Sequence, residues 1–136
     1  SLYQSFKKED DAIECFKKSI DLNKDFLNGY NILGDIFFKK KKYKEAIIYF
    51  KNSIRINYSI KNINAISLLA MSILGNYFET KNLIELKDAL IFFKKAHELD
   101  PSNDLFSKQL IYFYHLVGMK NEAVYLSKKR TGFFEI

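Results

Sequence analysis

Proline, glycine and cysteine are all scarce in this chain of 136 residues, which has one proline, five glycines and one cysteine. A sheet protein with many tight turns needs more glycine and proline, and a disulfide framework or a multi-thiolate metal site needs more cysteine. Long apolar runs are also lacking. The most apolar stretch, Ala65 to Gly75, is interrupted by two serines and is far shorter than the roughly 20 residues that span a bilayer. We therefore expect a helical protein without a membrane segment.

Hydrophobic residues make up 48% of the chain and aromatic residues 16%, which is ample for the packed core of one domain. They recur at helical rather than alternating spacing. Tyr30, Leu33 and Phe37 share one face of a first expected helix, and Ala46 and Phe50 share one face of a second. Two such faces must pack against each other, so the sequence predicts paired helices.

The same order of large and small residues recurs along the chain. It comprises Tyr30, Leu33, Gly34, Phe37, Ala46, Phe50 and Ser53, and then Met71, Leu74, Gly75, Phe78, Ala89, Phe93 and Ala96. This order resembles the tetratricopeptide repeat (TPR) family, whose unit of 34 residues has an aromatic, Leu-Gly and an aromatic residue on one helix, then Ala and an aromatic residue on the next. The resemblance implies an all-α fold, a right-handed α-solenoid of antiparallel helix pairs.

The resemblance divides the single domain, residues 1–136, into about three and a half units. We expect a partial unit at 1–26, a complete one at 27–60, a third with an insertion at 61–103, and a fourth at 104–136. In the first unit, a truncated helix should end near Lys8 and a second should run from Asp11 to Leu22. The chain opens without an initiator methionine and within a helical pattern, so it has the form of an excised fragment with an open N-terminal edge.

The period changes between the second and third units. Gly75 lies 41 residues after Gly34, so seven residues have been added to the repeat. We place them near Ile60 to Ser67, as an extended or additional helical segment or as an irregular loop. Asn82 should begin the following helix. At the other end, Phe133 and Phe134 should fold back as a cap or begin a further segment.

No residue pattern in the sequence indicates catalysis, a cofactor or a metal. The two histidines, His97 and His115, have no partner at metal-ligand spacing, and there is no glycine-rich phosphate loop. Cys15 should be a small apolar filler in a packing helix, and a lone cysteine suits a reducing, cytoplasmic compartment. We therefore expect a protein that is not an enzyme.

The resemblance also implies that first-helix residues line a concave groove for a peptide or protein segment. The corresponding residues are Asn31, Asp35 and Phe38, then Ser72 and Asn76, then Lys108, Tyr112 and His115. The Lys, Asn and Arg set with which some TPR co-chaperones clamp a C-terminal carboxylate is absent. We expect a protein-protein interaction module, part of a larger scaffold or co-chaperone-like protein.

Basic residues outnumber acidic residues by 22 to 16, which gives a net charge of +6. This charge favours an acidic protein or peptide partner. It leaves open a helical-repeat module that binds RNA, although the densest run, Lys39 to Lys42, falls at a helix end where the helix dipole favours cations. A third alternative is a structural segment that self-associates through its truncated N-terminal edge in a multi-subunit assembly.

Overall fold

A computed structural model describes residues 2–132, and of Tyr3 only the backbone; Phe133 and Phe134 lie outside this range. All regular structure in the described range is helical, which confirms the all-α class. The elements are α1 (Leu2–Leu22), α2 (Leu27–Lys39), α3 (Tyr43–Ile56), the short 3₁₀ helix η1 (Ile60–Asn62), α4 (Ile63–Thr80), α5 (Leu83–Leu99), α6 (Asp104–Leu116) and α7 (Lys120–Thr131).

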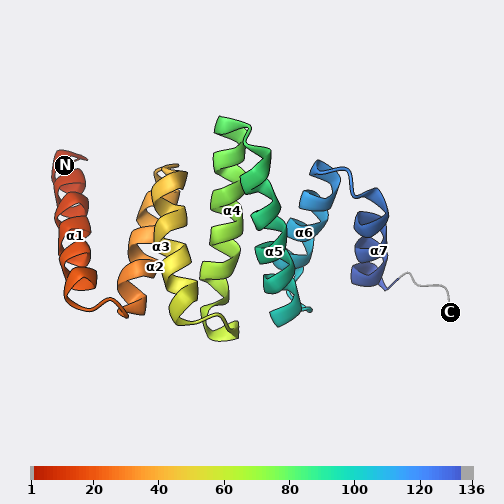
Figure 1. Cartoon of the computed structure of the whole chain (residues 1–136), viewed down its shortest axis with the longest axis horizontal. Coiled ribbons are helices and arrows are strands. Elements are labelled where there is room, and N and C mark those ends of the chain that lie inside the picture. Colours follow the sequence, from red (N-terminus) through yellow and green to blue (C-terminus); the bar gives the residue numbers. More distant parts are fainter. Residues whose placement is uncertain (1, 133–136) are drawn as a thin grey trace.

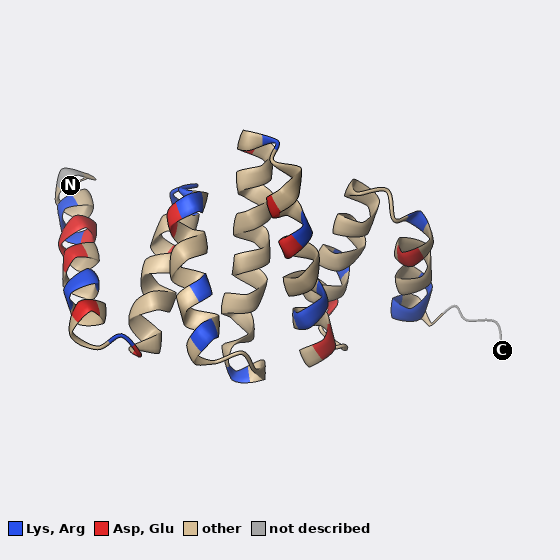
Figure 2. Cartoon of the chain, viewed as in Figure 1, with Lys and Arg blue, Asp and Glu red and all other residues tan. Residues whose placement is uncertain are grey.

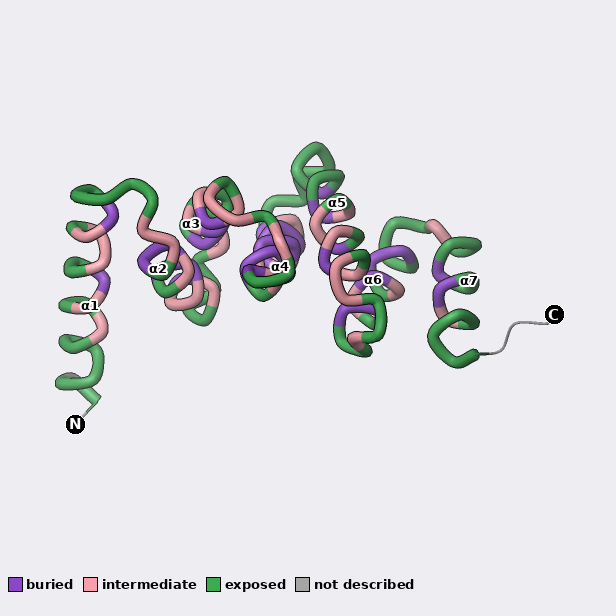
Figure 3. The backbone as a smooth tube through the Cα atoms, turned by 90° about the horizontal axis from the view of Figure 1, so that it is seen from below, coloured by how far each residue is buried: buried purple, intermediate pink, exposed green. Residues whose placement is uncertain are grey.

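The helices follow one another in a row from α1 at one end to α7 at the other (Figure 1). Seen from below, the row traces a shallow arch (Figure 3). Each helix packs mainly against its neighbours in sequence, and α2 also contacts α4. This is the α-solenoid that the repeat pattern predicts, since each helix pair buries its apolar face only against adjacent helices.

Small residues let the paired helices approach each other closely. Ala46 on α3 and Ala89 on α5 are fully buried, beside the equally buried Phe50 and Phe93. Gly34 lies directly against Phe50, because a Cβ atom at this glycine would be only 2.6 Å from the phenylalanine ring. The predicted close contact of Gly34 within its own helix pair is therefore confirmed.

The first helix differs from the prediction. Residues Leu2–Leu22 form one continuous helix, not the end of one helix followed by another. The segment contains no glycine or proline that would end a helix. Ile13 and Ile20 are buried against the rest of the core, and Glu9 pairs with Lys40 at 2.6 Å. The predicted truncated helix before Lys8 is wrong.

The third unit has a different register from the one its sequence indicates. Helix α4 begins 36 residues after α2, and its buried residues repeat those of α2 at the same interval. The buried set Gly29, Tyr30, Leu33, Gly34 and Phe37 corresponds to Ala65, Ile66, Leu69, Ala70 and Ile73. Gly75 and Phe78 lie five residues beyond those positions, and Phe78 is 44% exposed. Ala70, not Gly75, therefore occupies the place of Gly34.

The added residues consequently lie in the hairpin between α4 and α5. The interval from Ala70 to Ala89 is seven residues longer than that from Gly34 to Ala46, which is about two helical turns. The expected location of the seven added residues at Ile60 to Ser67 is wrong. The helical alternative for that stretch is nevertheless confirmed, because η1 and the start of α4 occupy it. In Figure 1 the α4–α5 hairpin rises above the pairs on both sides.

The added turns of α4 pack over the start of α3. A Cβ atom at Gly75 would lie 2.6 Å from the ring of Tyr43, so this glycine faces the preceding unit and not its own. Asn82 caps α5 as expected, its side-chain oxygen accepting from the amide of Ile84 at 3.0 Å. The Glu85 carboxylate accepts instead from Asn76 Nδ2 at 2.7 Å, which joins the two helices of the long hairpin.

Candidate functional site

A pocket of about 430 Å³ lies between α2 and α4, on the face formed by the first helix of each unit. Its base is apolar, with Ile36, Ala65 and Leu68, whereas its polar lining is rich in amides. The polar residues are Asn31, Asp35, Lys61, Asn62 and Asn64. An apolar base with a few convergent polar groups is the usual composition of a binding pocket.

A hydrogen-bond network fixes two of the amides that line this pocket, those of Asn31 and Asn62. Asn31 Nδ2 donates to Asn62 Oδ1 at 2.9 Å, and the Ser53 hydroxyl donates to Asn31 Oδ1. Asn62 Nδ2 donates to Ser53 Oγ and to the Asn57 carbonyl, each at 2.9 Å. Ser53 and Asn62 are buried. The network therefore ties the junction before α4 to both helices of the second unit and sets the orientation of Asn31.

Polar groups remain available around this network. A primary amide can make four hydrogen bonds, so Asn31 keeps one N–H and one acceptor position after its two internal bonds. Asn64 and Lys61 are exposed beside it. Asp35 pairs with Lys39 at 2.9 Å on the exposed surface of α2, a contact that contributes little to stability and can exchange for a partner's group.

The structure brings together only part of the predicted groove set. Asn31 and Asp35 line the pocket. Phe38 is half-buried and packs edge-on against Tyr43, with ring centroids 5.9 Å apart. On α6, the side chains of Lys108, Tyr112 and His115 are exposed, and Lys108 pairs with Asp104 at 2.9 Å. The α6 residues do not line the α2–α4 pocket and are exposed on the first helix of the next unit.

Ser72 and Asn76 do not line the α2–α4 pocket, and they are only 0% and 3% exposed. The Ser72 hydroxyl donates to the carbonyl of Leu68 at 2.7 Å, and Asn76 bonds to Glu85 in the hairpin. With the interval of 36 residues, the α4 positions that match Asn28, Asn31 and Asp35 are Asn64, Ser67 and Met71.

The sequence reasoning therefore missed Asn64, Lys61 and Met71. Asn64 and Lys61 line the pocket directly. Ser67 is buried, and its hydroxyl donates to Gln109 Oε1 on α6 at 3.0 Å. One signal could have found Asn64: the apolar positions Ile66, Leu69 and Ile73 repeat the spacing of Tyr30, Leu33 and Phe37 without needing a glycine.

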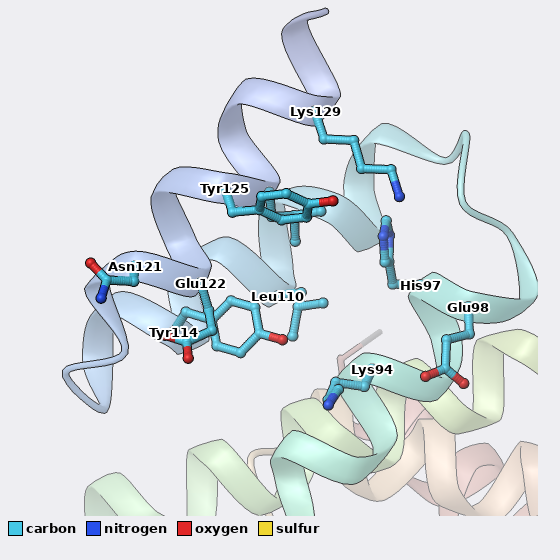
Figure 4. Close-up of a pocket in the computed structure, with 10 residues that line it drawn as sticks. Lys94, His97, Glu98, Leu110, Tyr114, Asn121, Glu122, Tyr125 and Lys129 are labelled. Carbon is cyan, nitrogen blue, oxygen red and sulfur yellow. The ribbon is translucent and has the colours of Figure 1, made fainter. Parts of the chain in front are cut away.

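A second pocket, of about 380 Å³, lies between α5, α6 and α7 (Figure 4). Leu110, Tyr114 and Leu126 contribute its apolar surface, and His97 and Lys129 lie at one side of it. Burial lowers the pKa of His97 below its ordinary value of 6.5, and the positive charge of Lys129 lowers this pKa further. His97 is therefore mostly neutral at physiological pH.

The serine beside His97 is placed as a structural group. Ser107 Oγ lies 3.4 Å from His97 Nδ1, but this hydroxyl also contacts the Asn103 carbonyl at 3.2 Å, and Ser107 is buried. A buried hydroxyl that already has two partners is poorly placed to attack a substrate. The pair is best explained as a link between α5 and α6.

Other chemical features can be stated for the described range. Among residues 2–132, no three or more His, Cys, Asp or Glu side chains gather as they would around a metal ion. Within the same range, no helix combines the length and apolar character needed to cross a membrane. Cys15 is exposed, so the expectation that it fills a packing gap is wrong.

Comparisons with known proteins agree with this architecture. A tetratricopeptide repeat family model matches residues 1–26 and 27–59. The solved structure of MamA 41-end from Desulfovibrio magneticus RS-1 has 18% identity and a TM-score of 0.73, covering 95% of this chain and 68% of that one. A MamA RS-1 ArsTM double mutant gives 18% identity and a TM-score of 0.76, covering 95% of this chain and 67% of that one.

A third structure, MamA MSR-1 C2, has 23% identity and a TM-score of 0.70, and the match covers 96% of this chain and 70% of that one. At such identities the likeness shows the fold. None of the curated proteins has significant sequence similarity to the chain. Repeats of this kind support protein-protein interaction and scaffolding. Residues 1–59 therefore match the tetratricopeptide repeat family model, and the described range has the helical-repeat fold of these solved structures.

Proposed function

We propose that this chain is a non-enzymatic module that binds a peptide or protein segment on its concave face, as part of a larger scaffold. The observation that carries the proposal is the α2–α4 pocket, in which Asn31 is held by the buried Ser53 and Asn62. Oriented amides can donate to and accept from a peptide backbone, and the apolar base can receive a side chain. Because the network forms within the chain, little ordering is needed on binding.

Exposed groups nearby favour an acidic partner with apolar anchors. Lys61 lies in the pocket and Lys108 on α6, and the chain has a net charge of +6. Leu105 and Tyr112 are 58% and 55% exposed on α6, so both can be buried by a partner. Large apolar residues at the centre of an interface carry much of its binding energy, whereas rim charges mainly speed the encounter.

The surface charge supports a protein partner over RNA. Acidic and basic residues are interspersed along α1, α3, α5 and α7 rather than gathered into one basic stripe (Figure 2). RNA-binding surfaces usually cluster their Lys and Arg residues on one face. The absence of the Lys, Asn and Arg clamp set argues against capture of a chaperone tail. The lone cysteine supports a reducing, cytoplasmic setting.

Selection from a random peptide library, followed by fluorescence anisotropy on the selected peptides, tests this proposal. Asn64→Ala and Lys108→Glu should each weaken binding by about tenfold, since each removes an exposed polar group from the proposed binding surface. Lys17→Glu and Lys94→Glu, which change charge on second helices of the units, serve as matched controls. All four variants should keep their melting temperatures. If the two control variants lose binding while Asn64→Ala and Lys108→Glu bind normally, the concave site is wrong.

A further inference from the structure

The lengthened α4–α5 hairpin leaves an apolar step at its border with the shorter α6–α7 pair. A hollow of about 560 Å³ lies there, between Leu83, Leu86 and Leu90 of α5 and Phe113, Val117 and Met119 of α6 and the turn after it. Helix α4 has 18 residues and α5 has 17, whereas α6 has 13 and α7 has 12. The first turns of α5 therefore extend past the helices that would cover them.

Two of the apolar side chains that line the hollow are exposed to solvent. Leu83 is 64% exposed and Val117 is 37% exposed, and Ile84, which follows Leu83 on α5, is 81% exposed. Single exposed apolar residues are ordinary on protein surfaces, but a group that surrounds a hollow is typical of an interaction site. The hollow lies at this place because of the two-turn insertion in the α4–α5 hairpin, and the repeat pattern itself would not create it.

The equivalent place one unit earlier is filled by an α-helix. Tyr43 and Ile47 of α3 correspond to Leu86 and Leu90 of α5, at an interval of 43 residues. The added turns of α4 lie over Tyr43, with Gly75 against its ring. Helix α6 ends at Leu116 and supplies no such turns above α5. The hollow therefore has the shape that a helix fills in the neighbouring unit.

We propose that this step binds an amphipathic α-helix of a partner protein, one that carries acidic residues beside its apolar face. Lys87 lines the hollow, Lys120 follows Met119, and Lys81 lies in the α4–α5 turn. Glu85, the acidic residue nearest in sequence to Leu83 and Leu86, already accepts from Asn76. Lys87 is the charged residue among those that line the hollow, and its positive charge complements acidic flanks on a docked helix.

The test uses two labelled synthetic helical peptides of about 14 residues, roughly four turns. Both have a Leu and Ala face; one is flanked by Glu and the other by Lys. The whole chain should bind the Glu-flanked peptide in fluorescence anisotropy titrations and bind the Lys-flanked peptide about tenfold more weakly. Lys87→Glu should reduce or reverse this preference.

Variants on and off the step locate the binding. Leu83→Asp and Val117→Asp should each lower the affinity of the chain for the Glu-flanked peptide by about tenfold or more. Ile91→Asp is the matched control, because Ile91 lies on the same helix, is 56% exposed and does not line the hollow. Lys108→Glu on α6 should also have no effect, which separates this surface from the concave groove.

The proposal is overturned if the unmodified chain binds neither peptide, or if Ile91→Asp weakens binding as much as Leu83→Asp does. It is also overturned if the chain forms a dimer in sedimentation experiments that Leu83→Asp abolishes, because a second copy would then be the occupant. Circular dichroism melts should show that all of these exposed-site variants remain folded.

Discussion

The helix pairs α2–α3 and α4–α5 share their centre and differ at one end. Ala46 and Phe50 in the first pair match Ala89 and Phe93 in the second, and all four are fully buried. The α4–α5 hairpin nevertheless has seven more residues between its small-residue contacts. The size of the side chains is therefore constrained where the two helices touch most closely. The length of the hairpin is not constrained in this way, because adding whole helical turns does not change which faces are buried.

The extra length has different effects on the two sides of the hairpin. Toward α3, Gly75 allows the added turns of α4 to pack closely on Tyr43. Toward α6, Leu83 has no comparable cover and stays exposed. One insertion thus strengthens the contact with the preceding unit and opens an apolar surface toward the following one.

Overpacking the shared centre should give the largest effect and test whether the two pairs are equivalent. Ala46→Leu and Ala89→Leu should each lower the free energy of unfolding by about 1 to 3 kcal/mol, because three further carbon atoms must fit where the helices touch. Urea unfolding measures this directly. Ala89→Leu with an unchanged midpoint would mean that α5 does not use the same contact as α3, whereas Ile91→Leu is the expected neutral control.

Glycine in the two hairpin turns should give a smaller and unequal gain. Lys41 and Lys81 both have left-handed backbone conformations, with φ of 60° and 59°. Glycine adopts this conformation without strain, so Lys41→Gly should raise the free energy of unfolding by up to about 1 kcal/mol. Lys81→Gly should gain less, because Lys81 Nζ also lies 5.7 Å from the ring centroids of Tyr77 and Phe78. Equal gains in thermal melts would show that these cation–π contacts contribute nothing.

Lowering the pH should destabilise the third unit through His97 and leave the second unit unaffected. This is the smallest of the expected effects on stability. His97 occupies the position of Ile54, and its pKa in the folded chain is lowered from 6.5 by burial and then by Lys129. The unfolded chain therefore binds the proton more tightly. Stability is complete above the unfolded pKa, falls as the pH drops from 6.5 toward the folded pKa, and levels off below it.

His97→Gln should remove this part of the pH dependence. Melting temperatures recorded from about pH 7.5 to pH 5 should fall less for the variant than for the unmodified chain. The Asp104 carboxyl does not overlap with this window. Its pKa is lowered from 3.8 by hydrogen bonds from Lys108 and Arg130, so its contribution is lost only in stronger acid. Parallel curves for the variant and the unmodified chain would assign the dependence to other groups.

Paired helices could be predicted from sequence where the apolar pattern was undisturbed. Tyr30, Leu33 and Phe37 are buried on α2, and Ala46 and Phe50 are buried on α3, as their spacing predicts. The third unit was misread because Ile73, Leu74 and Gly75 repeat the Ile-Leu-Gly sequence of the second unit. Burial shows that this second copy faces Tyr43, a contact that depends on the neighbouring unit and is absent from the local sequence.

The candidate site was predictable only where one helix determined it. The family resemblance placed Asn31 and Asp35 on the inner side of α2, and both line the pocket. The bond from Asn31 to Asn62 joins residues 31 positions apart, so it depends on the path of the junction before α4. The five-residue error in register moved the expected α4 residues to Ser72 and Asn76, away from the inner face that begins with Asn64.

The central structural claim is that the added turns of α4 pack on the preceding unit. Ala70, and not Gly75, then takes the place in the α4–α5 pair that Gly34 has in the α2–α3 pair. A double-mutant cycle on Gly75 and Tyr43 tests it most directly. Gly75→Ala alone should destabilise, since its Cβ would lie 2.6 Å from the Tyr43 ring. Alanine is otherwise the better helix former by about 1 kcal/mol, so in a Tyr43→Ala background the same change should be neutral or stabilising.

The account predicts a coupling energy between Gly75 and Tyr43 of at least about 1 kcal/mol from urea unfolding. Gly34→Ala with Phe50→Leu, a pair whose contact lies within one unit, is the positive control. Gly75→Ala combined with Phe93→Leu should show almost no coupling. Strong coupling of Gly75 to Phe93 and none to Tyr43 would contradict the account and restore the register that the Leu-Gly sequence first indicated.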